Sequence, residues 1–204
     1  MRRAVTDDDK LARRAEILTA AKTVFADRGY SATTMADIAR AAEVSYGVAY
    51  WYFASKDELF TALMAEEEAA LRAHIVAAFG EAPALDLRAV LHGAVFATFE
   101  FFEADRAAAA LLFRDSLVLG HDFDKHLAGM FGRFIDDFEV SVRSAKARGE
   151  VADVPSRLVA FTVTAVVSQL AIRRLSVDDG FSAEQAAAFV VSMVFDGIGS
   201  HRTS

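Results

Sequence analysis

The chain of 204 residues is 54% apolar, carries a net charge of −7 and contains no cysteine, so it can bury a core as one large domain or two small ones. The lack of cysteine excludes disulfides, thiolate catalysis and cysteine-ligated zinc, and it suits a reducing cytoplasm. The most apolar stretch, residues 158–172, is shorter than the roughly 20 residues that span a membrane, and residues 1–10 contain no apolar run typical of a signal peptide. We therefore expect a cytoplasmic protein without a membrane partner.

The charge is distributed unevenly along the chain. Residues 1–56 carry nine Lys or Arg against seven Asp or Glu, whereas residues 57–204 carry 13 against 22. Any contact with nucleic acid is therefore expected at the N-terminal end. The composition, with two prolines and 11 glycines, favours helix nearly throughout.

The N-terminal part predicts three helices. A first helix over residues 9–27 repeats apolar side chains at steps of three and four and ends at Gly29. Thr34 and Asp37 have the spacing of a capping box at the start of a short second helix, and Ser45 can cap a short third one. Two short helices joined by a tight turn and set on another form a helix-turn-helix, whose second helix enters the major groove of double-stranded DNA.

The remainder of the chain predicts further helices separated by glycines. A fourth helix over residues 56–79 serves as the connection, and later helices are expected at 85–104, 106–119, 123–148, 155–177 and 183–198. The expected fold is all-α with about nine helices in total. It comprises a helix-turn-helix domain at residues 1–56 and a larger helical domain at residues 57–204.

Many positions between residues 12 and 60 form a recognisable pattern, which is densest from Val44 to Lys56. These positions are Ile17, Leu18, Ala21, Phe25, Gly29, Thr34, Ile38, Ala39, Ala42, Val44, Ser45, Gly47, Tyr50, Tyr52, Phe53, Ser55, Lys56 and Leu59. The pattern resembles the N-terminal signature of the TetR family of transcriptional regulators. The resemblance implies a homodimer that binds near-palindromic operator DNA, usually as a repressor, and responds to a small molecule.

The resemblance also implies roles for particular side chains. Phosphate contacts are expected from Thr34, Tyr50 and Lys56, and base or groove contacts from Ser45, Tyr46, Gly47 and Trp51. Each has an alternative: Thr34 can serve only as a helix cap, and Lys56 can be an unpaired surface lysine. Because a cation in the first turn of a helix opposes the helix dipole, a phosphate partner would account for Lys56.

Two positions depart from the family pattern. Glu43 stands where the turn usually has glycine, and a φ above zero would cost a non-glycine residue about 1–2 kcal/mol. Ala36 stands where some members have a base-reading side chain, so we expect sequence specificity to rest mainly on the third helix.

The second half of the chain is rich in phenylalanine, since 15 of the 17 lie after residue 59. A well-packed core is one interpretation. The other is an apolar cavity for a lipophilic small molecule, because such sites combine apolar walls with few polar groups. The candidate cavity residues are Phe99, Phe102, Phe113, Phe131, Phe134, Thr164 and Ser168.

The last two predicted helices carry more apolar surface than one monomer can cover. Self-association would bury it, and the resemblance implies a four-helix bundle of these helices around a twofold axis. The candidate dimer residues are Val163, Val167, Leu170, Phe189 and Met193.

Enzymatic motifs are missing from the sequence. It contains no H-E-x-x-H, no glycine-rich phosphate loop and no G-x-S-x-G, so we expect neither catalytic residues nor a cofactor. His121, Asp122, Asp124 and His126 cluster closely enough to bind a divalent metal, but a solvated helix start is the favoured interpretation and no metal is expected. An alternative function is a DNA-binding protein with the same N-terminal unit and no ligand.

Overall fold

The computed structural model describes residues 6–79, 86–114, 121–177 and 180–198, excluding within these ranges the side chains of 113–114, 121–128, 130, 176 and 196–198. The described residues lie in helices or in the turns between them, which confirms the all-α fold. The helices are α1 (Asp7–Arg28), α2 (Met35–Ala41), α3 (Tyr46–Tyr52), α4 (Lys56–Phe79), α5 (Leu87–Ala104), α6 (Arg106–Ala109), α7 (His121–Ala147), α8 (Ser156–Ser176) and α9 (Ala183–Ile198), with a π-helical turn η1 (Ala110–Arg114) after α6.

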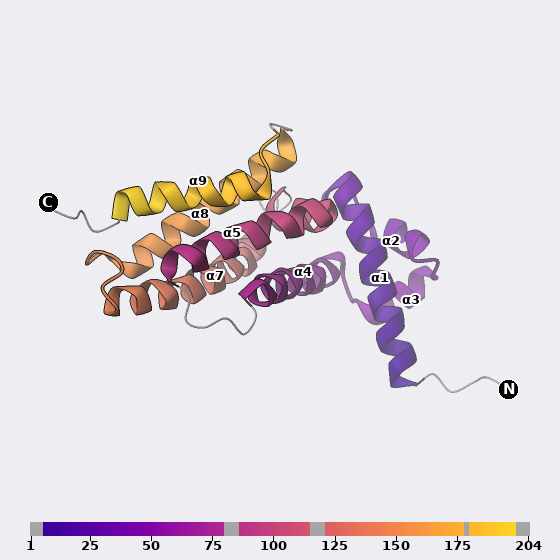
Figure 1. The fold of residues 1–204 in the computed structure, drawn as a ribbon. Helices are drawn as coiled ribbons and strands as arrows, with labels where there is room; N and C mark the ends of the chain where they lie inside the picture. Colours follow the sequence, from indigo (N-terminus) through magenta and orange to yellow (C-terminus); the bar gives the residue numbers. More distant parts are fainter. Residues whose placement is uncertain (1–5, 80–85, 115–120, 178–179, 199–204) are drawn as a thin grey trace, which may run out of the picture.

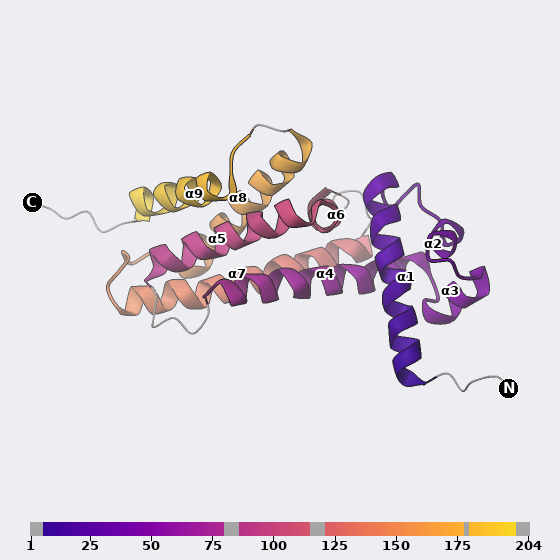
Figure 2. The same ribbon diagram turned by 45° about the vertical axis from the view of Figure 1, so that its right-hand side comes forward.

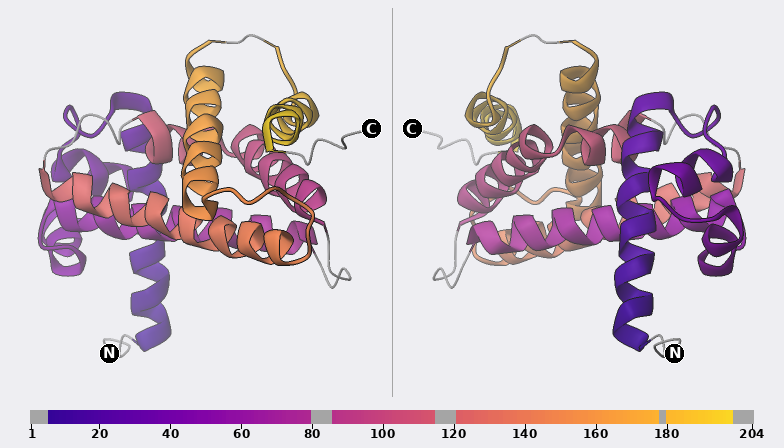
Figure 3. Two further views of the ribbon diagram at one scale, coloured as in Figure 1. Left: turned by 90° about the vertical axis from the view of Figure 1, so that its left-hand side faces the viewer. Right: turned by 90° about the vertical axis from the view of Figure 1, so that its right-hand side faces the viewer.

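Helices α1, α2 and α3 form a unit at one end of an elongated bundle (Figure 1). We call this unit the head and the part formed by α4–α9 the body. Helix α1 crosses the end of α4 steeply, with α2 and α3 on its far side (Figure 2). In the body, α9 packs along α5 and α7 packs on α8, which stands steeply across α4 and α7 (Figure 3). Buried side chains form a continuous core from the head into the body.

Local capping explains where the head helices begin. The hydroxyl of Thr34 accepts a hydrogen bond from the backbone N–H of Asp37 at 3.2 Å, and the Asp37 carboxylate accepts one from the N–H of Thr34 at 3.1 Å. The hydroxyl of Ser45 accepts from the N–H of Val48 at 3.2 Å. These contacts satisfy N–H groups that the first turn of a helix leaves open, and the predicted helix-turn-helix is confirmed.

The turn between α2 and α3 has the left-handed residue that the sequence suggested. Glu43 has a φ of 54°. Its N–H donates to the carbonyl of Arg40, and the N–H of Val44 donates to the carbonyl of Ala39 at 3.0 Å. This is a Schellman motif, in which glycine normally takes the position that Glu43 occupies here.

Replacing Glu43 tests whether this turn is strained. Glu43→Gly should raise the melting temperature by a few degrees, because relief of about 1–2 kcal/mol of left-handed strain exceeds the added entropy of an unfolded glycine, about 0.5–1 kcal/mol. Glu43→Ala removes the charge but keeps the Cβ atom, so it should bring no gain. Equal gains from both substitutions would assign the effect to charge instead of backbone conformation.

The predicted extent of one helix was wrong. Residues 106–119 were expected to form a single helix, but α6 ends at Ala109 and the π-helical turn η1 follows. Ala108, Ala109, Leu111 and Leu112 are all fully buried. An α-helix would already place these four positions on one side, within about 160°, so their burial does not account for the change. The turn η1 contacts α1, α4 and α8, and this tertiary packing is not visible in the periodicity of the sequence.

Candidate nucleic-acid interface and internal cavity

Helix α3 exposes aromatic side chains at the surface of the head. Tyr46 is 55% exposed and Trp51 is 67% exposed, and Tyr50 lies beside Tyr46 with 4.7 Å between their ring centroids. On the opposite side, Ala49 and Phe53 are buried in the core and fix the helix to the head. Large aromatic side chains left open to solvent on a firmly anchored helix are typical of a binding surface.

Gly47 lies in the same exposed surface. A Cβ atom added there would meet no atom within 4 Å, so packing inside the protein does not require glycine. Its φ is not in the left-handed region, so backbone conformation does not require it either. What glycine provides here is a bare backbone on the outer side of α3, which another molecule can approach closely.

The tyrosine pair of α3 offers neutral polar groups. A hydrogen bond with Tyr46 raises the pKa of the Tyr50 hydroxyl above its ordinary value, and burial and charge interaction with Tyr46 act in the same direction. The Tyr50 hydroxyl is therefore un-ionised at neutral pH and can donate to a phosphate oxygen.

The hydroxyl groups of Thr34 and Ser45, which cap α2 and α3, differ in whether the hydroxyl proton is already hydrogen-bonded. Thr34 also donates its hydroxyl proton to the Asp37 carboxylate at 2.6 Å, and these side-chain and backbone hydrogen bonds from Thr34 lower the pKa of Asp37. The proton of Ser45 has no such acceptor among the contacts of the described residues. In this arrangement Thr34 acts as a helix cap, while its phosphate contact remains a prediction.

Lys56 is not an unpaired surface lysine. Its ammonium donates to the backbone carbonyls of Tyr30 at 2.9 Å and Thr33 at 2.8 Å, and it lies 4.1 Å from the centre of the Tyr30 ring. Partial burial lowers the pKa of Lys56. The residue therefore ties the start of α4 to the turn between α1 and α2, and this contact was missed from the sequence.

A second lysine joins the head to the body. Lys22 of α1 donates to Glu67 of α4 at 2.7 Å and to Asp105, before α6, at 2.5 Å. Burial opposes the charged form, but the hydrogen bonds with Asp105 and Glu67 raise the pKa of Lys22 above its ordinary value. Burial likewise opposes ionisation of Asp105, yet the bond from Lys22 lowers its pKa. The link therefore stays charged through the neutral range.

Breaking this link should lower stability measurably. Lys22→Met removes the partner of Glu67, whose side chain is only 11% exposed, and losing a buried charged hydrogen bond costs about 1–3 kcal/mol. Because a change of 1 kcal/mol shifts the melting temperature of a domain this size by about 2–4 °C, a thermal melt should detect it. Adding Glu67→Gln to Lys22→Met should restore part of the lost stability.

A matched control comes from Arg13, which pairs with Glu16 at 2.6 Å on the exposed surface of α1. Arg13→Met should change the free energy of unfolding by no more than about 0.5 kcal/mol. Equal effects of Lys22→Met and Arg13→Met would contradict a structural role for the link.

The lowered pKa of Asp105 makes the stability of the protein depend on pH. The stabilisation that ionised Asp105 provides is complete above the ordinary pKa range of an aspartate, and it is lost as the pH falls through that range and below.

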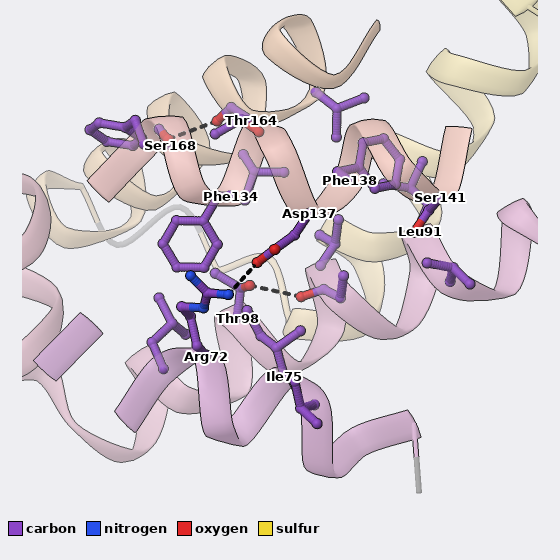
Figure 4. A pocket seen from close by; sticks show the side chains of 18 of the residues that line it. Arg72, Ile75, Leu91, Thr98, Phe134, Asp137, Phe138, Ser141, Thr164 and Ser168 are labelled. Carbon is purple, nitrogen blue, oxygen red and sulfur yellow. Dashed lines mark hydrogen bonds and ion pairs between the residues drawn. The ribbon is translucent and has the colours of Figure 1, made fainter. Parts of the chain in front are cut away.

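The body contains an apolar cavity of about 320 Å³ between α4, α5, α7 and α8. Four predicted ligand residues, Phe131, Phe134, Thr164 and Ser168, line it together (Figure 4). Its wall also includes Leu71, Ile75, Leu91, Val95, Thr98, Phe138, Ser141, Val163 and Val167. The hydroxyl of Ser168 donates to the carbonyl of Thr164 at 2.7 Å, so its proton is already used within α8.

The remaining ligand predictions fall elsewhere. Phe99 and Phe102 do not line the larger cavity. They line a second cavity of about 110 Å³ near the C-terminal ends of α5 and α8. The side chain of Phe113 lies outside the described residues. An ion pair between Arg72 and Asp137, 2.7 Å apart, borders the larger cavity (Figure 4) and was not predicted.

An apolar surface on α8 and α9 is left uncovered by the monomer. It consists of Leu158 and Phe161 on α8 and Phe189 and Met193 on α9, and Phe161 and Phe189 are 56% and 58% exposed. We call these four residues the outer face. The predicted dimer residues Val163 and Val167 line the cavity, and Leu170 is half-buried against the core. Of the predicted dimer residues, Phe189 and Met193 therefore belong to the outer face, and the dimer interface itself stays a prediction.

The segment Ser156–Leu175 of α8 is the described helix that is long and apolar enough to cross a membrane, judged by length and composition. Core helices of soluble proteins pass the same test, so this is weak evidence for a membrane span.

Comparison with known proteins identifies the head. Residues 17–63 match the model of the family described as bacterial regulatory proteins, tetR family. The HTH-type transcriptional repressor KstR2 of Rhodococcus jostii (strain RHA1) is 28% identical over 202 residues, covering 94% of this chain and 93% of the relative. Residues 17–63 are therefore identified as the N-terminal unit of a tetR-family regulator. Proteins of this family are DNA-binding transcriptional regulators.

Solved structures of transcriptional regulators share the arrangement of about nine-tenths of the chain. A TetR-like transcriptional regulator from Rhodococcus sp. RHA1 superposes with a TM-score of 0.74 at 26% identity, covering 91% of this chain and 94% of that one. The regulator FadR from Bacillus subtilis, in complex with stearoyl-CoA, has a TM-score of 0.82 at 17% identity, covering 90% and 98%. The similarity to the TetR family therefore extends beyond the head to the fold of the body.

One other predicted group concerns metal binding. The side chains of His121, Asp122, Asp124 and His126 lie outside the described residues. Among the side chains that are described, no group of three or more His, Asp or Glu is arranged to hold a metal ion.

Proposed function

We propose that the protein is a cytoplasmic, homodimeric transcriptional repressor that binds a near-palindromic operator through α3 and is released by a lipophilic small molecule. The observation that carries the proposal is the exposed surface of α3, where Tyr46, Gly47, Tyr50 and Trp51 are open to solvent on a helix-turn-helix of the TetR family. Aromatic edges and hydroxyls suit thymine methyl groups and phosphates, and the bare backbone allows close approach to the groove.

The outer face supports a twofold dimer. Phe161 and Phe189 expose large apolar areas on α8 and α9, two neighbouring helices that lie along one side of the body (Figure 1). Pairing α8 and α9 with those of a second copy would bury this surface in a four-helix bundle. Such a dimer presents two α3 helices to one side of the DNA, and half-sites about 34–36 Å apart, or a multiple of that, follow from the usual geometry.

The larger cavity supports a lipophilic effector. Its walls are mainly aliphatic and aromatic, and FadR from Bacillus subtilis, which shares the fold, is in complex with stearoyl-CoA. The cavity is lined by α4, whose first turn is tied to the head through Lys56. A ligand that favours one position of α4 would change the orientation of the head, and a coupling of about 1–3 kcal/mol would lower operator affinity roughly 5- to 150-fold.

Selection from a random pool of duplex DNA tests the proposal. The purified protein should retain a near-palindromic motif, and Tyr46→Ala should blur the recovered sequence. Val140→Ala is the matched control, because Val140 is an exposed apolar residue on α7, away from the head. A pool without an enriched motif for the wild-type protein would contradict the proposed function.

A further inference from the structure

The larger cavity offers no net charge to a ligand. Arg72 and Asp137 are its charged wall residues, and they neutralise one another in an ion pair of 2.7 Å. A free anion entering here would have to compete with the Asp137 carboxylate for Arg72. The apolar wall therefore suits the body of a lipophilic molecule more than a charged end.

The second cavity has a different character. It lies between the last turns of α5 and α8 and the first residue of α6, and its charged wall residues are Glu103, Arg106 and Arg174. Arg174 pairs with Glu103 at 2.9 Å. Within the part of the chain that the structure describes, Arg106 has no acidic partner, so the three side chains together leave one positive charge.

The two cavities follow one another along the same pair of helices. On α5, Thr98 lines the larger cavity and Phe102 the smaller one; on α8, Ser168 lines the larger and Ala171 the smaller. These positions are about one helical turn apart, or roughly 4.5–6 Å along each axis. The two cavities have no wall residue in common, and an amphiphile that reached across this turn would place its apolar body in the larger cavity and its polar end in the smaller one.

We propose that the effector is an anionic amphiphile whose carboxylate or phosphate is bound by Arg106 in the smaller cavity, with its apolar body in the larger one. This inference rests on the proposed function as a ligand-responsive regulator. A guanidinium without a carboxylate partner can form two parallel hydrogen bonds to either group. With about 110 Å³, the smaller cavity is large enough for such a head group, since a water molecule in the liquid occupies about 30 Å³.

The position of Arg106 connects this subsite to the head. Its neighbour Asp105 accepts the hydrogen bond from Lys22 of α1 and also caps α6 by accepting from the N–H of Ala108 at 3.0 Å. Arg106 therefore directly follows in the chain the residue whose carboxylate joins α1 to the body.

Calorimetric titration with matched alkyl compounds tests the proposal. Decanoate and decyl phosphate carry an anionic end, whereas decanol has the same chain without a charge. The wild-type protein should bind the better anion about tenfold to a hundredfold more tightly than decanol, the range expected for a charged hydrogen bond. Comparing decanoate with decyl phosphate then distinguishes the two head groups.

Substitutions locate the anionic end. Arg106→Gln should remove the preference for the anion and leave the affinity for decanol unchanged, while Arg72→Gln, at the larger cavity, should keep the preference. Loss of the preference in Arg72→Gln instead of Arg106→Gln would overturn the proposal, as would equal wild-type affinities for decanol and both anions. Either of these two results would still agree with a lipophilic effector, so the proposed function would stand. Failure of decanoate, decyl phosphate, decanol and their longer homologues to bind would count against both proposals.

Discussion

Gly47→Leu should weaken operator binding by about thirtyfold or more without lowering the melting temperature. A Cβ atom added at Gly47 has no neighbour within 4 Å, and Gly47 is exposed, so a longer side chain can extend into solvent. Leucine is also favoured over glycine in a helix by about 1 kcal/mol. The leucine side chain would also hold the backbone of α3 away from the DNA groove. Each lost base contact costs about 1–3 kcal/mol, and a dimer would lose one such contact in each of its two half-sites.

The matched control is Gly132→Leu. Gly132 lies on α7 and, like Gly47, has open space where a Cβ atom would be, so the same substitution is made far from the head. Operator affinity, measured by fluorescence anisotropy on the duplex selected from the random pool, should be unchanged in this variant. Wild-type affinity in Gly47→Leu would show that α3 does not lie in the groove.

The features of the head that were predicted from sequence depend on residues close together in the chain. Thr34 and Asp37, three residues apart, form the capping box, and Ser45 caps α3 through the N–H of Val48. The left-handed turn at Glu43 is closed by bonds within a few residues. Such contacts require only local backbone geometry, so spacing was sufficient to find them.

Contacts between distant parts of the chain could not be predicted in the same way. Lys56 binds a carbonyl 26 residues away, and Lys22 binds carboxylates that are 45 and 83 residues away. Neither lysine has a distinctive neighbour in the sequence. Their partners become visible only when α1, α4 and the start of α6 are placed together in the fold.

Helix α8 shows why its inward and outward sides could not be distinguished from the sequence. Apolar residues occur on nearly every side of it, so helical periodicity does not indicate which side faces outward. Val163 and Phe161 are two positions apart, yet Val163 lines the cavity and Phe161 faces solvent. The cavity and the outer face are on different sides of one helix, and packing against α7 determines which side is which.

The outer face leads to the second large effect, which combines Phe161→Arg with Phe189→Arg. Burying a phenylalanine side chain contributes about 1.5–3 kcal/mol, and a twofold dimer would bury four of them. Because these side chains are 56% and 58% exposed in the single chain, losing this burial amounts to about 3–7 kcal/mol, which weakens the dimer by roughly 10²- to 10⁵-fold. The added positive charges would also repel one another across the axis. We therefore expect a monomer at micromolar concentration in analytical ultracentrifugation, with the wild-type chain a dimer.

Both side chains are more than half exposed in the single chain, so the double variant should keep its helical content and the melting behaviour of a folded monomer. Val140→Arg provides the control, because Val140 is 60% exposed on α7 and lies outside the proposed interface; this variant should remain a dimer. Operator binding should fall with dimerisation, since a monomer engages one half-site only. A double variant that still sediments as a dimer would place the twofold interface on another surface, and the spacing of the two α3 helices would then have to be derived from that surface instead.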